Sequence, residues 1–139
     1  MKAYIKWIED RNFLGESDSG HAVVMGSKGG RSGVAIAPTP MEMILMGLGG
    51  CTSYDVVHIL ERGREAVAGC ALEIDAERAG EDPKVFTKIH LHFVVTGKKL
   101  NPAKVERAIA LSAEKYCSAS AMLARSVAIT HDFEVIEVS

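Results

Sequence analysis

The sequence predicts an α+β fold, and three features of its pattern support this class. Several segments alternate apolar and polar residues, as strands with one buried face do. One long segment, Met41–Ala66, is apolar at its start and carries helix-start signals. The predicted order is strands, long helix, two strands, helices and a final strand, which indicates antiparallel sheets around a long central helix.

Length, composition and charge exclude several classes of protein. The chain has 139 residues, which predicts a single domain over 1–139, and its 47% hydrophobic and 24% charged residues are ordinary for a soluble globular protein. A net charge of -2 provides no basic surface for nucleic acid. The N-terminus does not resemble a signal peptide, and no run approaches the roughly 18 apolar residues of a membrane span. We therefore expect a cytoplasmic protein with neither membrane nor nucleic-acid partner.

Three strands are predicted before the central helix. Met1–Ile8 alternates along its length, and Asn12–Ser17 and His21–Met25 are shorter strands joined by the turn residues Asp18–Gly20. The glycine-rich segment Gly26–Gly33 could hold a phosphate group. It lacks the Walker spacing and does not lead directly into a helix, so its composition favours a flexible connector.

The start of the central helix is marked by three residues. Thr39 can cap the helix, Pro40 suits its first position, and Glu42 lies three residues after the cap, as in a capping box. The first half of the helix is apolar nearly all round, which is typical of a helix buried on every side.

Three glycines interrupt this apolar helix. Gly47, Gly49 and Gly50 each cost about 1 kcal/mol relative to alanine, so we expect a backbone or ligand to approach them closely. We predict that the approaching element is the same helix of a second chain, which gives an intimate two-fold homodimer.

Strands and helices are also predicted after the central helix. Cys70–Ala79 and Phe86–Thr96 alternate as strands. Asn101 caps a helix that breaks around Tyr116–Ser118. The inward stripe of this helix comprises Val105, Ala108, Ile109 and Ser112. The last predicted elements are a short helix over Ser120–Arg125 and a strand over Val127–Val138.

Three cysteines, an odd number, fit a redox role better than a disulfide framework in the cytoplasm. Cys51 follows the glycines in mid-helix. Cys117 lies at a helix break near the start of the next helix, where a thiol pKa can be lowered. From the residues alone, inert buried thiols and a redox pair are equally supported. Cys70 lies on the apolar face of a strand and is predicted to be a core residue.

The histidines give weaker signals. His58 lies about 10.5 Å along the helix axis from Cys51, too far for a direct pair, and we expect it on a solvated face. His90 and His92 share a strand face, but two ligands without a third do not make a zinc site. His131 is in phase with apolar neighbours, which predicts a hydrogen-bonded core histidine. No metal or other cofactor is predicted.

Several motifs together resemble the OsmC family, the osmotically inducible and organic hydroperoxide resistance superfamily. They are the Pro-x-Glu helix start at Pro40–Glu42, the apolar run, Gly49-Gly50-Cys51 and the segment Glu114–Ser120. The segments Phe86–Phe93 and Ile129–His131 are similar to the YhfA-like branch of this family. The resemblance covers essentially the whole chain and implies an intertwined, domain-swapped dimer of α+β protomers with active sites at the subunit interface.

The resemblance also implies a chemistry. Cys51 would attack the O–O bond of a hydroperoxide as a thiolate and become a sulfenic acid, and Cys117 would condense with it to a disulfide that an external dithiol reduces. The family places an arginine and a glutamate beside the reactive thiol, and Arg31 and Glu42 are the candidates. Glu42 lies one position later than the family's usual glutamate, and a capping role fits it at least as well.

Two functions follow from this resemblance. The first is a thiol-dependent reductase of small hydroperoxides in oxidative-stress defence, with organic substrates favoured by the apolar residues near the thiol, Met43, Met46 and Leu48. The second is a non-catalytic, dimeric OsmC-like protein that binds a ligand or senses redox state. Metal binding through Cys51, Cys117 and a histidine is the least favoured interpretation.

Overall fold

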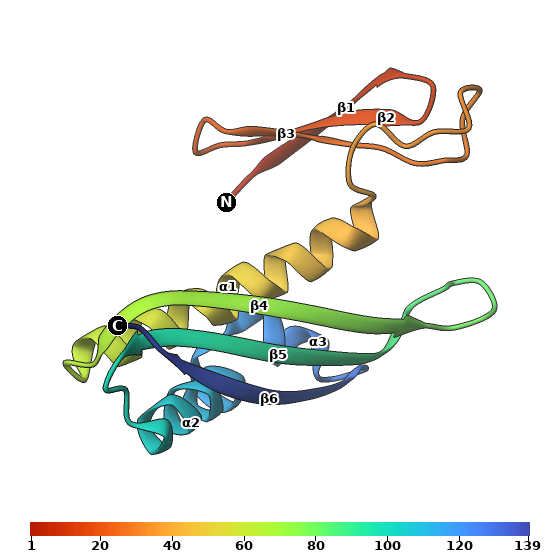
Figure 1. Ribbon diagram of the computed structural model, residues 1–139. Helices are drawn as coiled ribbons and strands as arrows, with labels where there is room; N and C mark the ends of the chain where they lie inside the picture. Colours follow the sequence, from red (N-terminus) through yellow and green to blue (C-terminus); the bar gives the residue numbers. More distant parts are fainter. The chain divides into compact units, whose positions relative to one another are not determined.

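The computed structural model describes all residues from Met1 to Ser139 and confirms the α+β class. By their internal contacts the residues form two compact units, Met1–Met46 and Gly47–Ser139. Helix α1, Pro40–Arg62, begins in the first unit and ends in the second (Figure 1). The single domain over 1–139 stays a prediction.

The first unit contains a three-stranded antiparallel sheet. Its strands are β1 (Ala3–Glu9), β2 (Asn12–Ser17) and β3 (Ala22–Met25), in the order β1-β2-β3. These are the three strands that the alternation predicts. The chain passes from β2 to β3 through Gly20, whose φ of 89° is a backbone conformation that glycine adopts without a steric penalty.

The predicted capping box begins α1. The N–H of Glu42 donates to Thr39 Oγ1 at 3.2 Å, and the N–H of Thr39 donates to Glu42 Oε1 at 3.1 Å. Two backbone donors that the helix leaves unpaired are therefore satisfied by side chains, and the local sequence is sufficient to fix this end of the helix.

The other end of α1 differs from the prediction. The helix ends at Arg62 rather than at Ala66. Arg64 has a left-handed φ of 60°, and the N–H of Glu65 donates to the carbonyl of Leu60 at 2.9 Å. This is the pattern of a Schellman cap, which satisfies the last carbonyls of the helix and reverses the chain. The following strand therefore begins at Ala66 itself.

The second unit contains a sheet of three long strands, β4 (Ala66–Arg78), β5 (Phe86–Lys98) and β6 (Ala128–Glu137), in the order β4-β5-β6. β4 and β5 are antiparallel, as predicted. β6 pairs with β5 in parallel, so the prediction of purely antiparallel sheets is wrong for this pair. The helices between the two strands form the crossover that parallel neighbours require.

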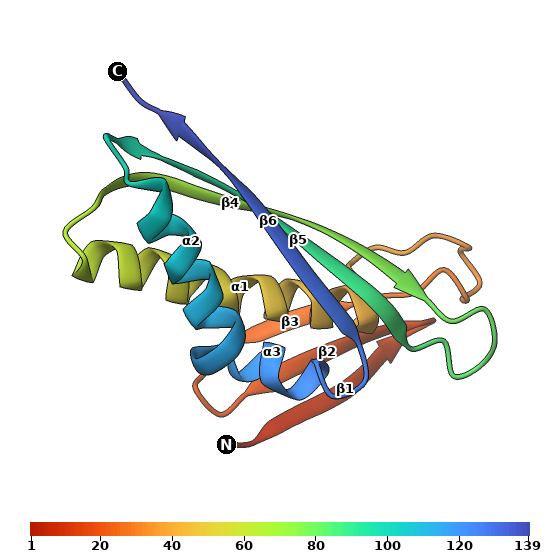
Figure 2. The same ribbon diagram turned by 90° about the horizontal axis from the view of Figure 1, so that it is seen from below.

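The crossover consists of three helical segments: α2 (Pro102–Leu111), a π-helical turn η1 (Ser112–Tyr116) and α3 (Ser118–Leu123). They lie with the second half of α1 on one side of the sheet (Figure 2). Asn101 caps α2 by accepting the N–H of Ala103 at 3.0 Å. The predicted break at Cys117 is confirmed, because its extended backbone ends the π-helical turn.

One apolar core fills the space between this sheet and its helices. Its members share complete or nearly complete burial and come from α1, β5 and α2: Leu48, Val56, Leu60, Ile89, Leu91, Phe93, Val95, Val105, Ala108 and Ile109. Gly49 permits α1 to lie close to β4, because a Cβ at this position would be 2.9 Å from Ile74 Cδ1. The close approach expected at the glycines is thus made at Gly49 by the protein's own sheet.

The rest of α1 is less buried than its sequence predicts. Ile44, Met46 and Tyr54 are 42%, 50% and 70% exposed, so the single chain does not bury the helix on every side. A Cβ at Gly47 or Gly50 would find no atom within 4 Å. The open face of α1 therefore carries glycine and apolar side chains together.

By length and composition α1 could cross a membrane, which corrects the prediction that no segment approaches a span. Its most apolar 18-residue window has a mean hydropathy of 1.4. The same test is passed by core helices of soluble proteins, and one face of α1 packs in the core described above.

Candidate functional site

Cys51 and Cys117 lie together in the second unit. Cys51 is half-buried on α1, while Cys117 is 2% exposed and caps α3. Both are free thiols, and Cys51 lies near enough to Cys117 to raise its pKa. The N–H of Ser120 also donates to Cys117 Sγ at 3.3 Å. The fold thus brings together two cysteines that are far apart in the sequence.

The surroundings of Cys117 keep its thiol protonated. Burial is the largest cause that raises the pKa of Cys117, and the neighbouring Cys51 raises it further, while the donors of Ser120 lower it. A raised pKa favours the neutral form of the Cys117 thiol.

A chain of polar side chains lies beside the thiols. The hydroxyl groups of Thr52 and Ser112 are 2.8 Å apart in the core, and Ser112 donates to Asp55 Oδ2 at 2.8 Å. Thr52 and Ser112 are 2% and 0% exposed. In the sequence, Ser112 falls on an apolar stripe that gives no sign of this chain, because nothing local links α1 to residues 60 positions away.

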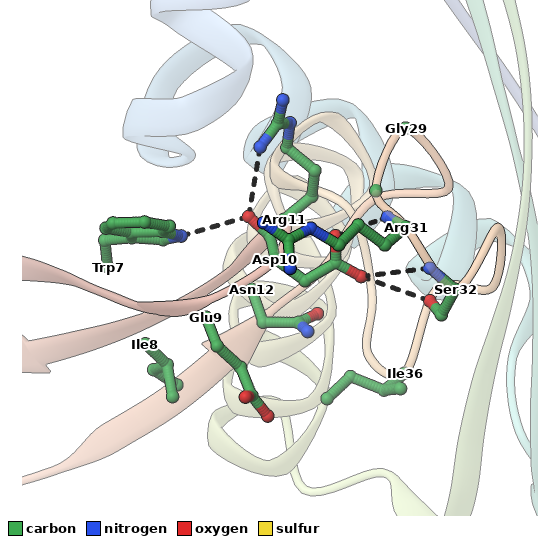
Figure 3. Close-up of a pocket in the computed structure, with 11 residues that line it drawn as sticks. Trp7, Ile8, Glu9, Asp10, Arg11, Asn12, Gly29, Arg31, Ser32 and Ile36 are labelled. Atoms are coloured by element: carbon green, nitrogen blue, oxygen red, sulfur yellow. Dashed lines mark hydrogen bonds between the residues drawn. The ribbon is translucent and has the colours of Figure 1, made fainter.

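Arg31 lies in the first unit, at the rim of an open cavity of about 940 Å³ between the β1–β2 turn and the glycine-rich loop (Figure 3). The N–H groups of Arg31 and Ser32 donate to the Asp10 carboxylate at 2.5 and 3.4 Å. These bonds, chiefly that from Arg31, lower the pKa of Asp10. The amides of Arg31 and Ser32 are thus occupied by Asp10 and not available to a phosphate. The role of Arg31 beside a thiol stays a prediction.

Glu42 uses its carboxylate at the helix start. The N–H of Thr39 is the largest cause that lowers the pKa of Glu42, and the hydroxyl of Thr39 adds to it. The capping function is confirmed. Glu42 forms no ion pair with Arg31 in this structure, so the bidentate pair that the resemblance implies also stays a prediction.

Two histidines form a cluster with an aspartate that the sequence analysis missed. Asp132 Oδ1 lies 2.9 Å from His90 Nε2 and 2.7 Å from His92 Nδ1, on the half-exposed face of β5 and β6. The hydrogen bond to Asp132 raises the pKa of His92, and the bond to His92 is the first cause that lowers the pKa of Asp132. The pairing was not predictable because it depends on the parallel register of β6.

The remaining candidates are placed as follows. His58 is exposed and stacks on Tyr54 with a centroid distance of 5.7 Å, which fits the predicted solvated face. His131 is exposed, so its prediction as a core residue is wrong; it lies on β6, the edge strand of its sheet. Cys70 is half-buried, and burial raises its pKa. No group of three His, Cys, Asp or Glu side chains is arranged to hold a metal ion.

An α+β chain with two sheets and a long central helix that carries a cysteine defines the class of OsmC-like proteins. The family model described as OsmC-like protein matches residues 29–132, and the chain belongs to this family. The resemblance drawn from the sequence motifs is therefore confirmed.

Within the family, the chain is 51% identical over 136 residues to Protein YhfA from Escherichia coli K12, and the match covers 98% of both proteins. The OsmC-like protein from Mycoplasma pneumoniae superimposes with a TM-score of 0.82 at 13% identity, covering 97% of this chain and 96% of the other. An organic hydroperoxide resistance protein from Legionella pneumophila gives a TM-score of 0.68 at 18% identity, covering 99% and 98%. The two structures show that the fold is shared.

Proposed function

We propose that this protein reduces organic hydroperoxides in defence against oxidative stress, through a Cys51 sulfenate and a Cys51–Cys117 disulfide. The observation that carries the proposal is the proximity of a half-buried Cys51 to a buried Cys117, whose pKa is raised by burial and by Cys51. The half-buried sulfur is the one that a small substrate can reach. The buried sulfur is protected from the substrate and, in this proposal, reacts with the oxidised Cys51.

The proposed reaction proceeds in three balanced steps. The Cys51 thiolate attacks the O–O bond of the hydroperoxide and takes the terminal OH as a sulfenic acid, while the O–O bond breaks and the leaving alkoxide takes a proton from water to become the alcohol. The Cys117 thiol then condenses with the sulfenic acid, which forms the disulfide and releases water. An external dithiol reduces this disulfide and is itself oxidised to a disulfide.

Family relationship supports the proposal and suggests roles for two further residues. The Legionella relative is named as an organic hydroperoxide resistance protein and predicted redox protein. By analogy with the family, Arg31 would stabilise thiolate and polarise the peroxide, and Glu42 would orient its guanidinium in addition to capping α1. The exposed apolar side chain of Met46 supports an organic substrate.

We propose further that the working protein is a homodimer located in the cytoplasm. β1 alone exposes four large apolar side chains, Tyr4, Ile5, Trp7 and Ile8, each by 50% or more. Exposed apolar surface of this extent marks an interaction site in a soluble protein. A second copy is the occupant that family membership favours, and three unpaired cysteines suit a reducing compartment.

The test is the consumption of cumene hydroperoxide with a dithiol reductant. Cys51→Ser is expected to abolish turnover. Cys117→Ser is expected to form a sulfenic acid, trapped by dimedone, without forming a disulfide. Cys70→Ser is the matched control, because Cys70 is also half-buried but lies outside the pair, and it is expected to retain wild-type turnover. Equal rates from the wild type and Cys51→Ser would exclude the enzymatic function.

The second candidate is a non-catalytic binding or redox-sensing protein of the same family. The observation that favours it is the engagement of Glu42 in the capping box, which leaves one carboxylate oxygen for any catalytic role. In that case the Cys51–Cys117 disulfide would form once after oxidation, without repeated consumption of peroxide.

A further inference from the structure

Hydroxyl groups on the two segments that lead to the thiols form a chain with a fixed direction. Ser112 has one hydroxyl proton, which it donates to Asp55 Oδ2 at 2.8 Å. The bond of 2.8 Å between Thr52 and Ser112 must therefore use the proton of Thr52. The order is Thr52 to Ser112 to Asp55, and no buried side-chain polar atom is left unpaired.

This chain connects the two segments that carry the cysteines. Thr52 follows Cys51 on α1, and Ser112 begins the π-helical turn η1, which Cys117 directly follows. The backbone carbonyl of Ser112 accepts the N–H of Cys117 at 2.9 Å. Ser112 thus binds α1 through its side chain and Cys117 through its main chain. π-helical turns of this kind occur frequently at functional sites.

We propose that Thr52, Ser112 and Asp55 are positioning residues that hold the Cys117 segment on α1 at the separation that disulfide formation requires. Disulfide geometry tolerates little variation, so a small loss of register between α1 and η1 lowers the fraction of time in which the sulfurs can react. The inference rests on the proposed function for its biological meaning, because it concerns the disulfide step of that reaction.

The burial of the chain makes it suited to this task. Thr52 and Ser112 are 2% and 0% exposed, so water cannot replace either partner if their hydrogen bond is broken. The bond therefore favours one position of η1 relative to α1. Asp55 is half-buried and forms the accessible end of the chain. It borders a groove shared by α1 and the crossover helices, lined also by His58, Arg62 and Tyr116.

The experiment measures the effective concentration of the two thiols by equilibrating the protein with oxidised and reduced dithiothreitol. Oxidised dithiothreitol takes the two electrons and two protons of Cys51 and Cys117 as they form a disulfide, so no peroxide is needed. Thr52→Val, which keeps the shape of the side chain but removes its hydroxyl, is expected to lower the effective concentration about tenfold, or about 1.4 kcal/mol. Ser112→Ala and Asp55→Ala are expected to lower it as well.

Two further variants separate positioning from general loss of structure. Thr52→Ser restores the hydroxyl and is expected to restore the effective concentration. Thr130→Val removes a hydroxyl with an equally short bond, 2.7 Å to His90, on the far strand β6 and is expected to have no effect. The rate at which Cys70 reacts with an alkylating reagent reports whether each variant keeps the fold of the second unit.

Wild-type effective concentrations in Thr52→Val, Ser112→Ala and Asp55→Ala would overturn the proposal, as would a Thr52→Ser variant that behaves like Thr52→Val. If Ser112→Ala fails to fold, the effective concentration in Asp55→Ala provides the test, because Asp55 is only half-buried and its replacement disturbs the core less. Failure of the proposed function would appear separately, as a wild-type protein that forms the disulfide with dithiothreitol but does not consume peroxide.

Discussion

The three glycines of α1 have the same residue type but different surroundings, and this difference yields a quantitative prediction. A methyl group at Gly49 would lie 2.9 Å from Ile74 Cδ1 and 3.4 Å from Leu72 Cδ2. Both atoms are the far ends of flexible side chains, so they can shift at a modest cost, which opposes the gain of about 1 kcal/mol from replacing a helical glycine by alanine. Gly49→Ala is therefore expected to gain less stability than the about 1 kcal/mol of an unobstructed helical position.

Gly47 and Gly50 lack such neighbours, since an added Cβ would find no atom within 4 Å in the protomer. A substitution there leaves the packing of the single chain unchanged. If a second copy covers this face of α1, as we propose, a bulky residue at Gly50 prevents the close approach of the two helices. Gly50→Leu is therefore expected to yield folded monomers where the wild type is dimeric.

The assays are urea unfolding for stability and light scattering for molar mass. Gly47→Ala is the control, because Gly47 lies in the same helix with no atom within 4 Å of an added Cβ. The packing argument would be refuted by a Gly49→Ala variant that gains as much stability as this control. The dimer proposal would be refuted by a wild-type monomer, or by a Gly50→Leu protein that dimerises with wild-type affinity.

Two further predictions concern the cluster of His90, His92 and Asp132 and the start of α1. Because the pKa of His92 is raised from 6.5 and that of Asp132 is lowered from 3.8, their bond stabilises the fold most where both are charged. The wild type should exceed Asp132→Asn in stability most between about pH 4 and 6.5. The difference should decrease as the pH rises through the raised pKa of His92, which then loses its charge. It should also decrease as the pH falls through the lowered pKa of Asp132, which is then protonated. Urea unfolding across a pH series measures this, and a difference independent of pH would contradict it. Thr39→Ala removes one half of the capping box and should lower the free energy of unfolding by about 1 kcal/mol, whereas Thr39→Ser should lower it less. Urea unfolding measures both values. Equal losses of stability in the two variants would show that the hydroxyl group does not cap the helix.

Local patterns in the sequence predicted the secondary structure well where the determining interactions are local. The alternation of Ile89, Leu91 and Phe93 marks a buried strand face, and Thr39 with Glu42 marks the helix start, because a period or a cap involves residues a few positions apart. The end of α1 was missed because Arg64 occupies the left-handed position where glycine is the usual signal.

What the sequence alone determined is the α+β class, the family, and two cysteines, one within the long helix and one at a helix break, since each of these depends on residue type and short spacing. The tertiary structure decided the parallel pairing of β6, the meeting of Asp132 with His92, and the proximity of Cys51 to Cys117. These depend on how the crossover from β5 to β6 closes over the sheet. The packing of the whole core fixes the position of the crossover helices on the sheet. No short segment of the sequence is sufficient to predict that position.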